Sequence, residues 1–242
     1  MSILDILKLK LDSLTGNEHY GFYYKSLDLV LGELYKKFGF NPYNYYEFGT
    51  GTGVSLTYYL KALKKIIKLK KLDLKKFRIF LFDSFEGLPE YTNPKDYNPG
   101  WTKGQFSGTE DYIKNLIKSL FPEVLDNVLF VKGYYENTLN EKLQKSLNQF
   151  PPSIVNIDVD YYTSTKTVLE WIHPILQDGT IFYFDDIYEY LGNLSKGEYR
   201  AIDEFNTHHA SEGLHFYPFP HLGIMSFTGK VFTFNRTVPG ES

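Results

Sequence analysis

Hydrophobic residues along this chain fall into two kinds of segment that alternate. Short apolar runs that predict strands cover residues 43–48, 77–82, 128–131, 153–157 and 180–184. The run at 77–82 suits a strand buried on both faces of a sheet. Apolar residues at helical spacing between and after these runs predict helices at 24–38, 54–69, 109–120, 137–147, 163–176 and 198–209. We expect two further strands at 214–218 and 230–234.

This order predicts an α/β fold. Strands that alternate with helices form a mostly parallel sheet with helices on both faces, here with seven strands. The last two strands predict one antiparallel strand near an edge. Residues 1–40, with amphipathic segments at 2–15 and 24–38 around a polar loop, predict an N-terminal helical cap on a core of residues 41–242. The length of 242 residues suits a single domain.

Composition narrows the functional classes. A net charge of −3 gives no reason to expect a nucleic-acid partner. The absence of cysteine excludes disulfides, thiolate-bound metals and a cysteine nucleophile. The first residues carry Asp5, Lys8 and Lys10 and do not read as a signal peptide, and no apolar run reaches membrane-spanning length. We therefore expect a cytoplasmic protein without a membrane partner.

The first expected strand runs into a glycine-rich turn. Residues 47–53 read Glu-Phe-Gly-Thr-Gly-Thr-Gly, and an amphipathic helix follows. Glycines let the backbone bend sharply and approach a ligand closely, and the helix N-terminus adds free N–H groups. The spacing resembles the first motif of S-adenosylmethionine-dependent methyltransferases that have a Rossmann-like sheet. A turn with only a structural role is the alternative.

Acidic residues stand at the ends of four expected strands. They are Glu47, Asp83, Asp158 and Asp185. Ligands of open α/β sheets bind at the carboxyl ends of the strands, so these side chains should meet at one edge.

Three of the acids near this edge predict a metal site. Asp158, Asp185 and Asp186 should converge if their two strands are neighbours, and like charges that close need a cation, a basic side chain or a proton. Oxygen ligands favour a hard ion such as Mg²⁺. The alternative is that one aspartate caps a strand exit while the others are solvated.

Several segments together resemble the macrocin O-methyltransferase family, whose members methylate sugar hydroxyls. The most specific are Asp-Ser-Phe-Glu-Gly-Leu-Pro at 83–89 and Asp-Val-Asp-Tyr-Tyr-Thr-Ser-Thr at 158–165. The others are 47–53, 132–139, 185–186 and 199–205. The resemblance implies a class I, Rossmann-like methyltransferase that uses S-adenosylmethionine and Mg²⁺, with a small-molecule or saccharide acceptor; a homodimer is compatible with it.

The resemblance also implies residue roles. The residues that would contact the cofactor are Glu47, Gly49, Gly51, Gly53, Ser55, Asp83, Ser84, Phe85, Gly133, Tyr134 and Asp158. The metal ligands would be Asp158, Asp185 and Asp186.

Transfer of a methyl group to a sugar hydroxyl needs a base, because the hydroxyl is protonated at neutral pH. Asp158 would act through the metal, and Asp160 lies two residues further on. His19, Glu110 and the pair 208–209 are further candidates. Residues 83–110 form a long irregular stretch of the kind that serves as a lid or binding loop.

The sequence therefore predicts a Mg²⁺-dependent S-adenosylmethionine O-methyltransferase acting on a sugar or a saccharide-bearing metabolite. Two alternatives remain open. One is a metal-dependent phosphoester hydrolase that uses the three aspartates, and the other is a binding module that keeps a nucleoside pocket without turnover.

Overall fold

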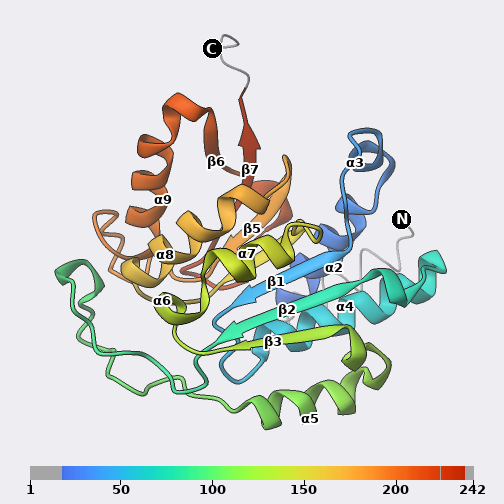
Figure 1. Ribbon diagram of the computed structural model, residues 1–242, viewed down its shortest axis with the longest axis horizontal. Coiled ribbons are helices and arrows are strands. Elements are labelled where there is room, and N and C mark those ends of the chain that lie inside the picture. The colour runs from blue at the N-terminus through green and yellow to red at the C-terminus, as the bar shows by residue number, and fades with distance from the viewer. Residues whose placement is uncertain (1–17, 224, 238–242) are drawn as a thin grey trace.

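The computed structural model of the protein describes residues 18–223 and 225–237 (Figure 1). The helix expected at 2–15 lies outside these residues.

A seven-stranded sheet forms the centre of the molecule, with the strand order β3-β2-β1-β4-β5-β7-β6 (Figure 1). Its strands are β1 (Asn44–Phe48), β2 (Arg78–Asp83), β3 (Val128–Lys132), β4 (Ile154–Ile157), β5 (Thr180–Phe184), β6 (Leu214–Pro218) and β7 (Lys230–Arg236). Strand β7 pairs antiparallel with both β5 and β6, whereas the other four pairings are parallel. The expected mostly parallel sheet with one antiparallel strand near its edge is confirmed.

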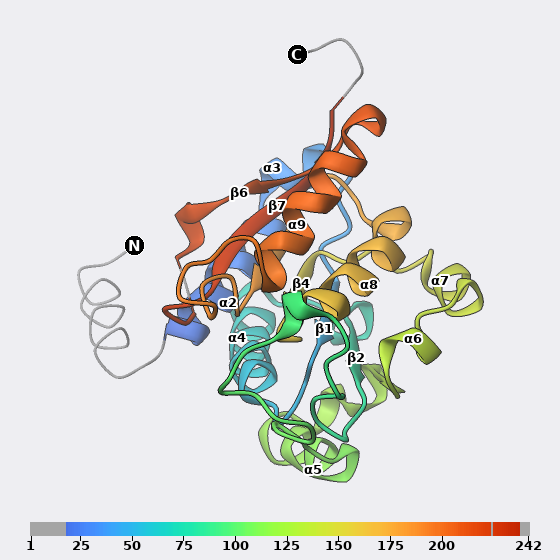
Figure 2. The same ribbon diagram turned by 90° about the vertical axis from the view of Figure 1, so that its left-hand side faces the viewer.

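Helices cover both faces of the sheet (Figures 1 and 2). On one face α2 packs against α4, and α4 against α5; on the other α8 packs against α9. The helices are α2 (Glu18–Val30), α3 (Glu33–Lys37), α4 (Val54–Lys70), α5 (Glu110–Leu120), α6 (Tyr135–Thr138), α7 (Glu141–Leu147), α8 (Tyr162–Ile172) and α9 (Gly197–His208). Short 3-10 turns occupy 74–76, 94–96, 122–127, 173–175, 210–212 and 220–222.

The alternation of side chains along the central strands builds two hydrophobic cores. In β1, Tyr45 belongs to the core under α2 and α4, whereas Tyr46 and Phe48 belong to the core under α8 and α9. All five residues of β1 are buried, since helices cover the strand on both sides. This double cover explains why the central strands read as continuous apolar runs.

Three predicted helices have different boundaries in the structure. The segment predicted as a helix at 24–38 begins earlier, at Glu18 inside the predicted polar loop, and is divided into α2 and α3 at Gly32, whose backbone is extended. The helix predicted at 137–147 is also two helices, because the Asn140 side chain accepts a hydrogen bond from Leu143 N and so starts α7 afresh.

The helix predicted at 163–176 begins one residue earlier and ends at Ile172. Pro174 lies in the 3-10 turn that follows, where a proline ring cannot continue an α-helix. Thr163 was expected to cap this helix. It instead lies within the first turn, and its N–H and hydroxyl donate to the Asp96 carboxylate at 2.9 and 2.8 Å.

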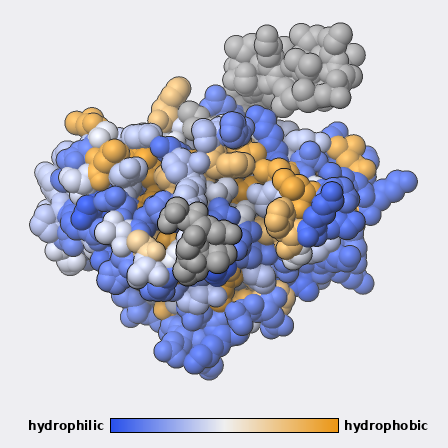
Figure 3. All heavy atoms as spheres, turned by 90° about the horizontal axis from the view of Figure 1, so that it is seen from above, coloured by the Kyte–Doolittle hydropathy of each residue, from blue (hydrophilic) through white to orange (hydrophobic). Residues whose placement is uncertain are grey.

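The face in Figure 3 is mostly hydrophilic, with apolar residues in separate groups. Within residues 18–223 and 225–237, no helix is long and apolar enough to cross a bilayer.

Candidate active site

The four strand-end acids line one cavity of about 430 Å³ at the carboxyl edge of the sheet. Glu47 is the penultimate residue of β1 and Asp83 the last residue of β2. Asp158 and Asp185 directly follow β4 and β5, which are parallel neighbours. The predicted convergence of these acids at a single edge is therefore confirmed.

The glycine turn forms one wall of this cavity. Gly49 has a φ of 80°, and a Cβ atom there would lie 1.7 Å from the carbonyl oxygen of Asp158. Only glycine fits where the exits of β1 and β4 approach so closely. Gly53, with a φ of 76°, directly precedes α4, so the N-terminal turn of α4 faces the same space.

Asp83 is fixed by two backbone donors. Its Oδ2 accepts from Gly51 N at 2.7 Å and its Oδ1 from Phe85 N at 2.6 Å. The carboxylate thus ties the glycine turn of β1 to the exit of β2. Each oxygen keeps a further lone pair, so Asp83 can still accept hydrogen bonds from a pair of ligand hydroxyls.

Glu47 is fully buried and only half satisfied. One carboxyl oxygen accepts from the hydroxyl of Tyr45, which lies 3.1 Å from the hydroxyl of Tyr23 on α2. The other, Oε1, is buried and has no hydrogen-bond partner among the described residues. Burial raises the pKa of Glu47 to about 8. A ligand ammonium group would supply the missing partner.

A cluster of carboxylates lies beside Glu47. Oxygens of Asp158, Asp160 and Asp186 are within 4.8 Å of one another, and Asp185 lines the same cavity. Glu198, at the start of α9, joins them from behind: its Oε2 accepts from Asp186 N at 3.0 Å. The proximity places Asp160 rather than Asp185 in the tightest group of three.

The electrostatics of this cluster suit a cation. Burial and the neighbouring carboxylates raise the pKa of Asp158, Asp186 and Glu198 well above its usual range. Burial, followed by the charge on Asp185, raises the pKa of Asp160 to about 7. Asp186 Oδ2 and Glu198 Oε1 are buried without a partner in the described part of the chain. An all-oxygen donor set with unsatisfied atoms fits a hard divalent ion.

Most of the other predicted cofactor residues line the cavity: Gly49, Gly51, Ser55, Ser84, Gly133 and Tyr134. Gly53 and Phe85 do not line the cavity but are next to lining residues in the chain. A Cβ atom on Gly53 would lie 2.9 Å from a methyl group of Ile113, and the ring of Phe85 packs against Phe130.

The base candidates differ in position. Asp160 lines the cavity and has a strained positive φ of 60°. His19 is not among the lining residues; its ring stacks on that of Tyr58, and burial lowers its pKa. Glu110 pairs with Lys114 at the start of α5.

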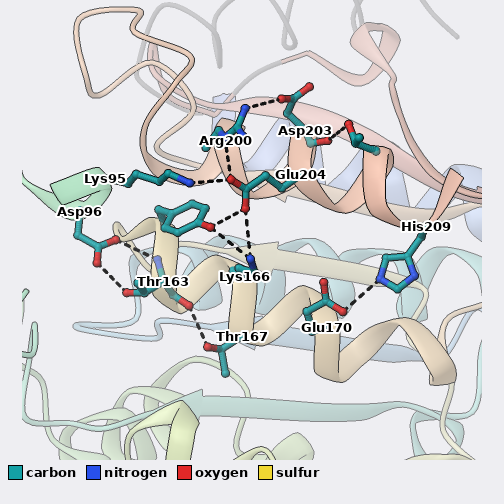
Figure 4. Close-up of polar contacts among 12 residues, drawn as sticks. Lys95, Asp96, Thr163, Lys166, Thr167, Glu170, Arg200, Asp203, Glu204 and His209 are labelled. Carbon is teal, nitrogen blue, oxygen red and sulfur yellow. Dashed lines mark hydrogen bonds and ion pairs between the residues drawn. The ribbon is translucent and has the colours of Figure 1, made fainter. Parts of the chain in front are cut away.

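The histidine pair at 208–209 lies at the far end of α9. Nε2 of His209 is 3.1 Å from a carboxylate oxygen of Glu170 (Figure 4). Nδ1 of the same ring is 3.1 Å from a carboxylate oxygen of Glu212. These contacts hold α9 to α8 and to the turn that follows it. Of the candidate bases, the geometry favours Asp160.

The long irregular segment 84–109 closes one side of the cavity. It is fastened to the far layer of helices through Asp96, which binds Thr163, and through Lys95, whose Nζ lies 2.7 Å from Glu204 Oε1 (Figure 4). Burial alone would raise the pKa of Glu204, but hydrogen bonds from Lys95 and other donors lower it to about 2. The segment is therefore held in place, and its Trp101 lines the cavity.

Sequence reasoning did not single out Glu198, Glu189, Glu136 or Trp101 as site residues. Glu198 lies in the first turn of a helix, where acids are common, and only its long-range contact with Asp186 reveals its burial. Trp101 lies in a segment without periodicity, so nothing in the sequence places its ring.

Comparison with known proteins assigns the chain to a family. The family model described as macrocin-O-methyltransferase (TylF) matches residues 62–213, more than half of the chain. The chain belongs to the macrocin-O-methyltransferase family. The protein is accordingly an O-methyltransferase. The match begins after the glycine turn, so the family model says nothing about residues 47–53. Their place in the site rests on the geometry described above.

Solved structures share the fold at low sequence identity. The O-methyltransferase NovP superposes with a TM-score of 0.64 at 17% identity, over 91% of this chain and 81% of that one. The calicheamicin methyltransferase CalS11 gives 0.61 at 21% identity, over 87% and 77%. Cofactor-bound Rv0187 from MTB gives 0.51 at 15% identity, over 96% and 97%. No curated protein matches the chain.

Proposed function

We propose that this family member transfers a methyl group from S-adenosylmethionine to a hydroxyl of a sugar or a saccharide-bearing metabolite, with Mg²⁺ at the carboxylate cluster. The observation that carries the proposal is the convergence of the acids that end β1, β2, β4 and β5 on one cavity. A donor that combines an ammonium group with ribose hydroxyls has partners there at Glu47 and Asp83.

The residues divide the binding of the methyl donor between them. Asp83, already oriented by two backbone N–H groups, accepts from the ribose hydroxyls. Glu47 receives the ammonium group at its unpartnered oxygen. Gly133 and Tyr134 flank the adenine, and Ser55 at the start of α4 holds the donor carboxylate. Binding in this way fixes the direction of the reactive methyl group.

Asp158 and Asp186 would hold the divalent ion with Asp185 as the third carboxylate, which leaves Asp160 for the role of base. Such an ion supplies positive charge that favours the deprotonated form of a neighbouring hydroxyl, and the sulfonium supplies an electrophilic methyl group. Asp160 accepts the hydroxyl proton, since its pKa of about 7 suits a base that works near neutral pH. Membership of an O-methyltransferase family disfavours the hydrolase alternative.

Three finer expectations belong to the same proposal. We propose that residues 1–242 act as one methyltransferase domain, that the protein works in the cytoplasm, and that it forms a homodimer. Every described strand joins a single sheet, which supports the first.

The test is a turnover assay that measures S-adenosylhomocysteine produced from the methyl donor with a panel of glycosides. We expect product formation that EDTA abolishes and Mg²⁺ restores. Formation of no product with any glycoside would refute the proposed reaction. Full activity after EDTA treatment would refute only the role of the metal.

A further inference from the structure

The lining of the cavity is strongly one-sided in charge. It contains eight carboxylates, those of Glu47, Asp83, Glu136, Asp158, Asp160, Asp185, Asp186 and Glu189. Within residues 18–223 and 225–237, no lysine, arginine or histidine lines it. Sites that receive phosphate or carboxylate groups present cationic side chains or the N–H groups of a helix start. The start of α4 faces this cavity, but the proposed function assigns it to the carboxylate of the methyl donor.

The proposed reactants do not remove this excess. The ammonium and sulfonium groups of the methyl donor outweigh its carboxylate, so the donor is positively charged. Together with a divalent ion, it still supplies fewer positive charges than the lining has carboxylates. Burial raises the pKa of Glu47 to about 8, but Glu136 is exposed and Glu189 is partly exposed. A negatively charged acceptor entering beside them would be repelled.

One large aromatic side chain, Trp101, lines the same cavity as the carboxylates and packs against two tyrosines. The Trp101 ring lines the cavity and lies 5.8 Å from the ring of Tyr161, the residue directly after Asp160. It also meets the ring of Tyr190 edge-on at 5.5 Å. The Tyr190 hydroxyl donates to the carbonyl oxygen of Asp96 at 3.1 Å. Trp101 therefore lines the same cavity as the proposed base and packs against the residue that follows it, on a segment that Asp96 holds at two points.

A flat indole in a cavity that also holds a proton acceptor suits a sugar ring. The C–H face of a pyranose packs on an aromatic ring, while its hydroxyls point outward to polar partners. Trp101 would hold the ring, and Asp160 and Glu189 would receive its hydroxyls or a ring amine.

We propose that Trp101 forms the platform of the acceptor subsite, and that this subsite takes a neutral or amine-bearing glycosyl group in preference to a nucleotide sugar. The inference rests on the proposed methyl transfer and adds the chemical class of its acceptor. The pyrophosphate of a nucleotide sugar would meet carboxylates and no cationic partner among the described residues.

The test compares matched acceptors on the full-length protein with S-adenosylmethionine and Mg²⁺. A panel of hexoses, 6-deoxyhexoses and aminohexoses is supplied both as methyl glycosides and as nucleoside diphosphate esters. We expect kcat/KM for the best methyl glycoside to exceed that for its nucleotide ester by about tenfold or more. Equal or faster turnover of nucleotide sugars, or no turnover of any glycoside, would overturn the inference.

Variants of one loop test the platform. Trp101→Ala should raise KM for the glycoside about tenfold or more, with a smaller effect on kcat, and Trp101→Phe should recover most of the loss. Tyr91→Ala is the matched control, because Tyr91 is a 45% exposed aromatic residue of the same segment that does not line the cavity. An unchanged KM in Trp101→Ala, or an equal change in Tyr91→Ala, would contradict the role of Trp101.

Binding of S-adenosylhomocysteine, measured by calorimetry on the same samples, separates the two proposals. If it does not bind the wild-type protein, the proposed function has failed. If it binds equally to wild type and both Trp101 variants while the acceptor preference is reversed, only the acceptor inference has failed.

Discussion

Replacing Glu47 with glutamine tests the most unusual group of the site. The side chain keeps its shape and its oxygen acceptor for the Tyr45 hydroxyl, but it can no longer ionise. In the wild-type protein Glu47 is 0% exposed, and its second oxygen has no partner among the described residues. The substitution therefore removes the ability of this buried group to ionise and changes little else.

The magnitude follows from the pKa. Burial raises the pKa of Glu47 from 4.5 to about 8, and each unit corresponds to about 1.4 kcal/mol, so ionisation costs the folded protein on the order of 4 to 5 kcal/mol. The folded protein keeps a proton that the unfolded chain loses between pH 4.5 and 8. The wild type thus loses stability as pH rises through this window.

The glutamine variant lacks this loss. We expect Glu47→Gln to match the wild type near pH 4, to exceed it by about 2 kcal/mol near pH 6, and to exceed it by roughly 4 kcal/mol above pH 8. The free energy of unfolding is measured by urea titration followed by fluorescence across this range, without ligand. Glu136→Gln is the control, because Glu136 lines the same cavity but is exposed.

The same variant should bind S-adenosylhomocysteine at least about tenfold more weakly, because the ligand ammonium loses a charged partner. A pH-independent difference in stability between Glu47→Gln and the wild type would refute the argument from burial. Unchanged ligand affinity would refute the assignment of Glu47 to the ammonium group.

Three further outcomes are expected. Asp158→Asn and Asp186→Asn should each lower turnover at least about a hundredfold, because a neutral amide binds a hard cation weakly. Added Mg²⁺ should not restore turnover in either variant. Turnover near that of the wild type would contradict the metal site. Asp96→Ala should destabilise the protein by about 1 to 3 kcal/mol and speed proteolysis within 84–109, because Thr163 loses the acceptor of its two hydrogen bonds. Limited trypsin digestion measures the cleavage rate, and an unchanged rate would contradict this prediction. Phe48→Ala should cost about 3 to 5 kcal/mol in urea unfolding, since Phe48 is 0% exposed between β1 and the α8 layer, and a loss below 1 kcal/mol would contradict that packing.

The strands could be predicted well because of their burial. A strand covered on both faces needs apolar residues at every position, as in Tyr45, Tyr46 and Phe48, and that signal is contained in the local sequence. Helix boundaries are not contained in the local sequence in the same way. The early start of α2 and the separation of α6 from α7 depend on tertiary packing and on a single side-chain cap at Asn140.

The site could be predicted as far as topology alone decides it. Acids at the ends of parallel strands meet at one edge whatever the loops do, so Glu47, Asp83 and Asp158 could be placed from the sequence. Glu198 and Trp101 reach the same cavity from a helix start and an irregular loop. Their positions depend on long-range packing, such as the bond between Asp96 and Thr163, which no local pattern records.

The central claim is that the acids at the carboxyl edge form the binding site of the methyl donor. Calorimetric titration of S-adenosylhomocysteine into the wild-type protein and into Asp83→Ala tests it most directly. We predict a saturable one-site isotherm for the wild type and an affinity at least about tenfold lower for the variant, because Asp83 accepts from the ribose hydroxyls. No heat at millimolar ligand, or equal affinity in both proteins, would contradict the claim.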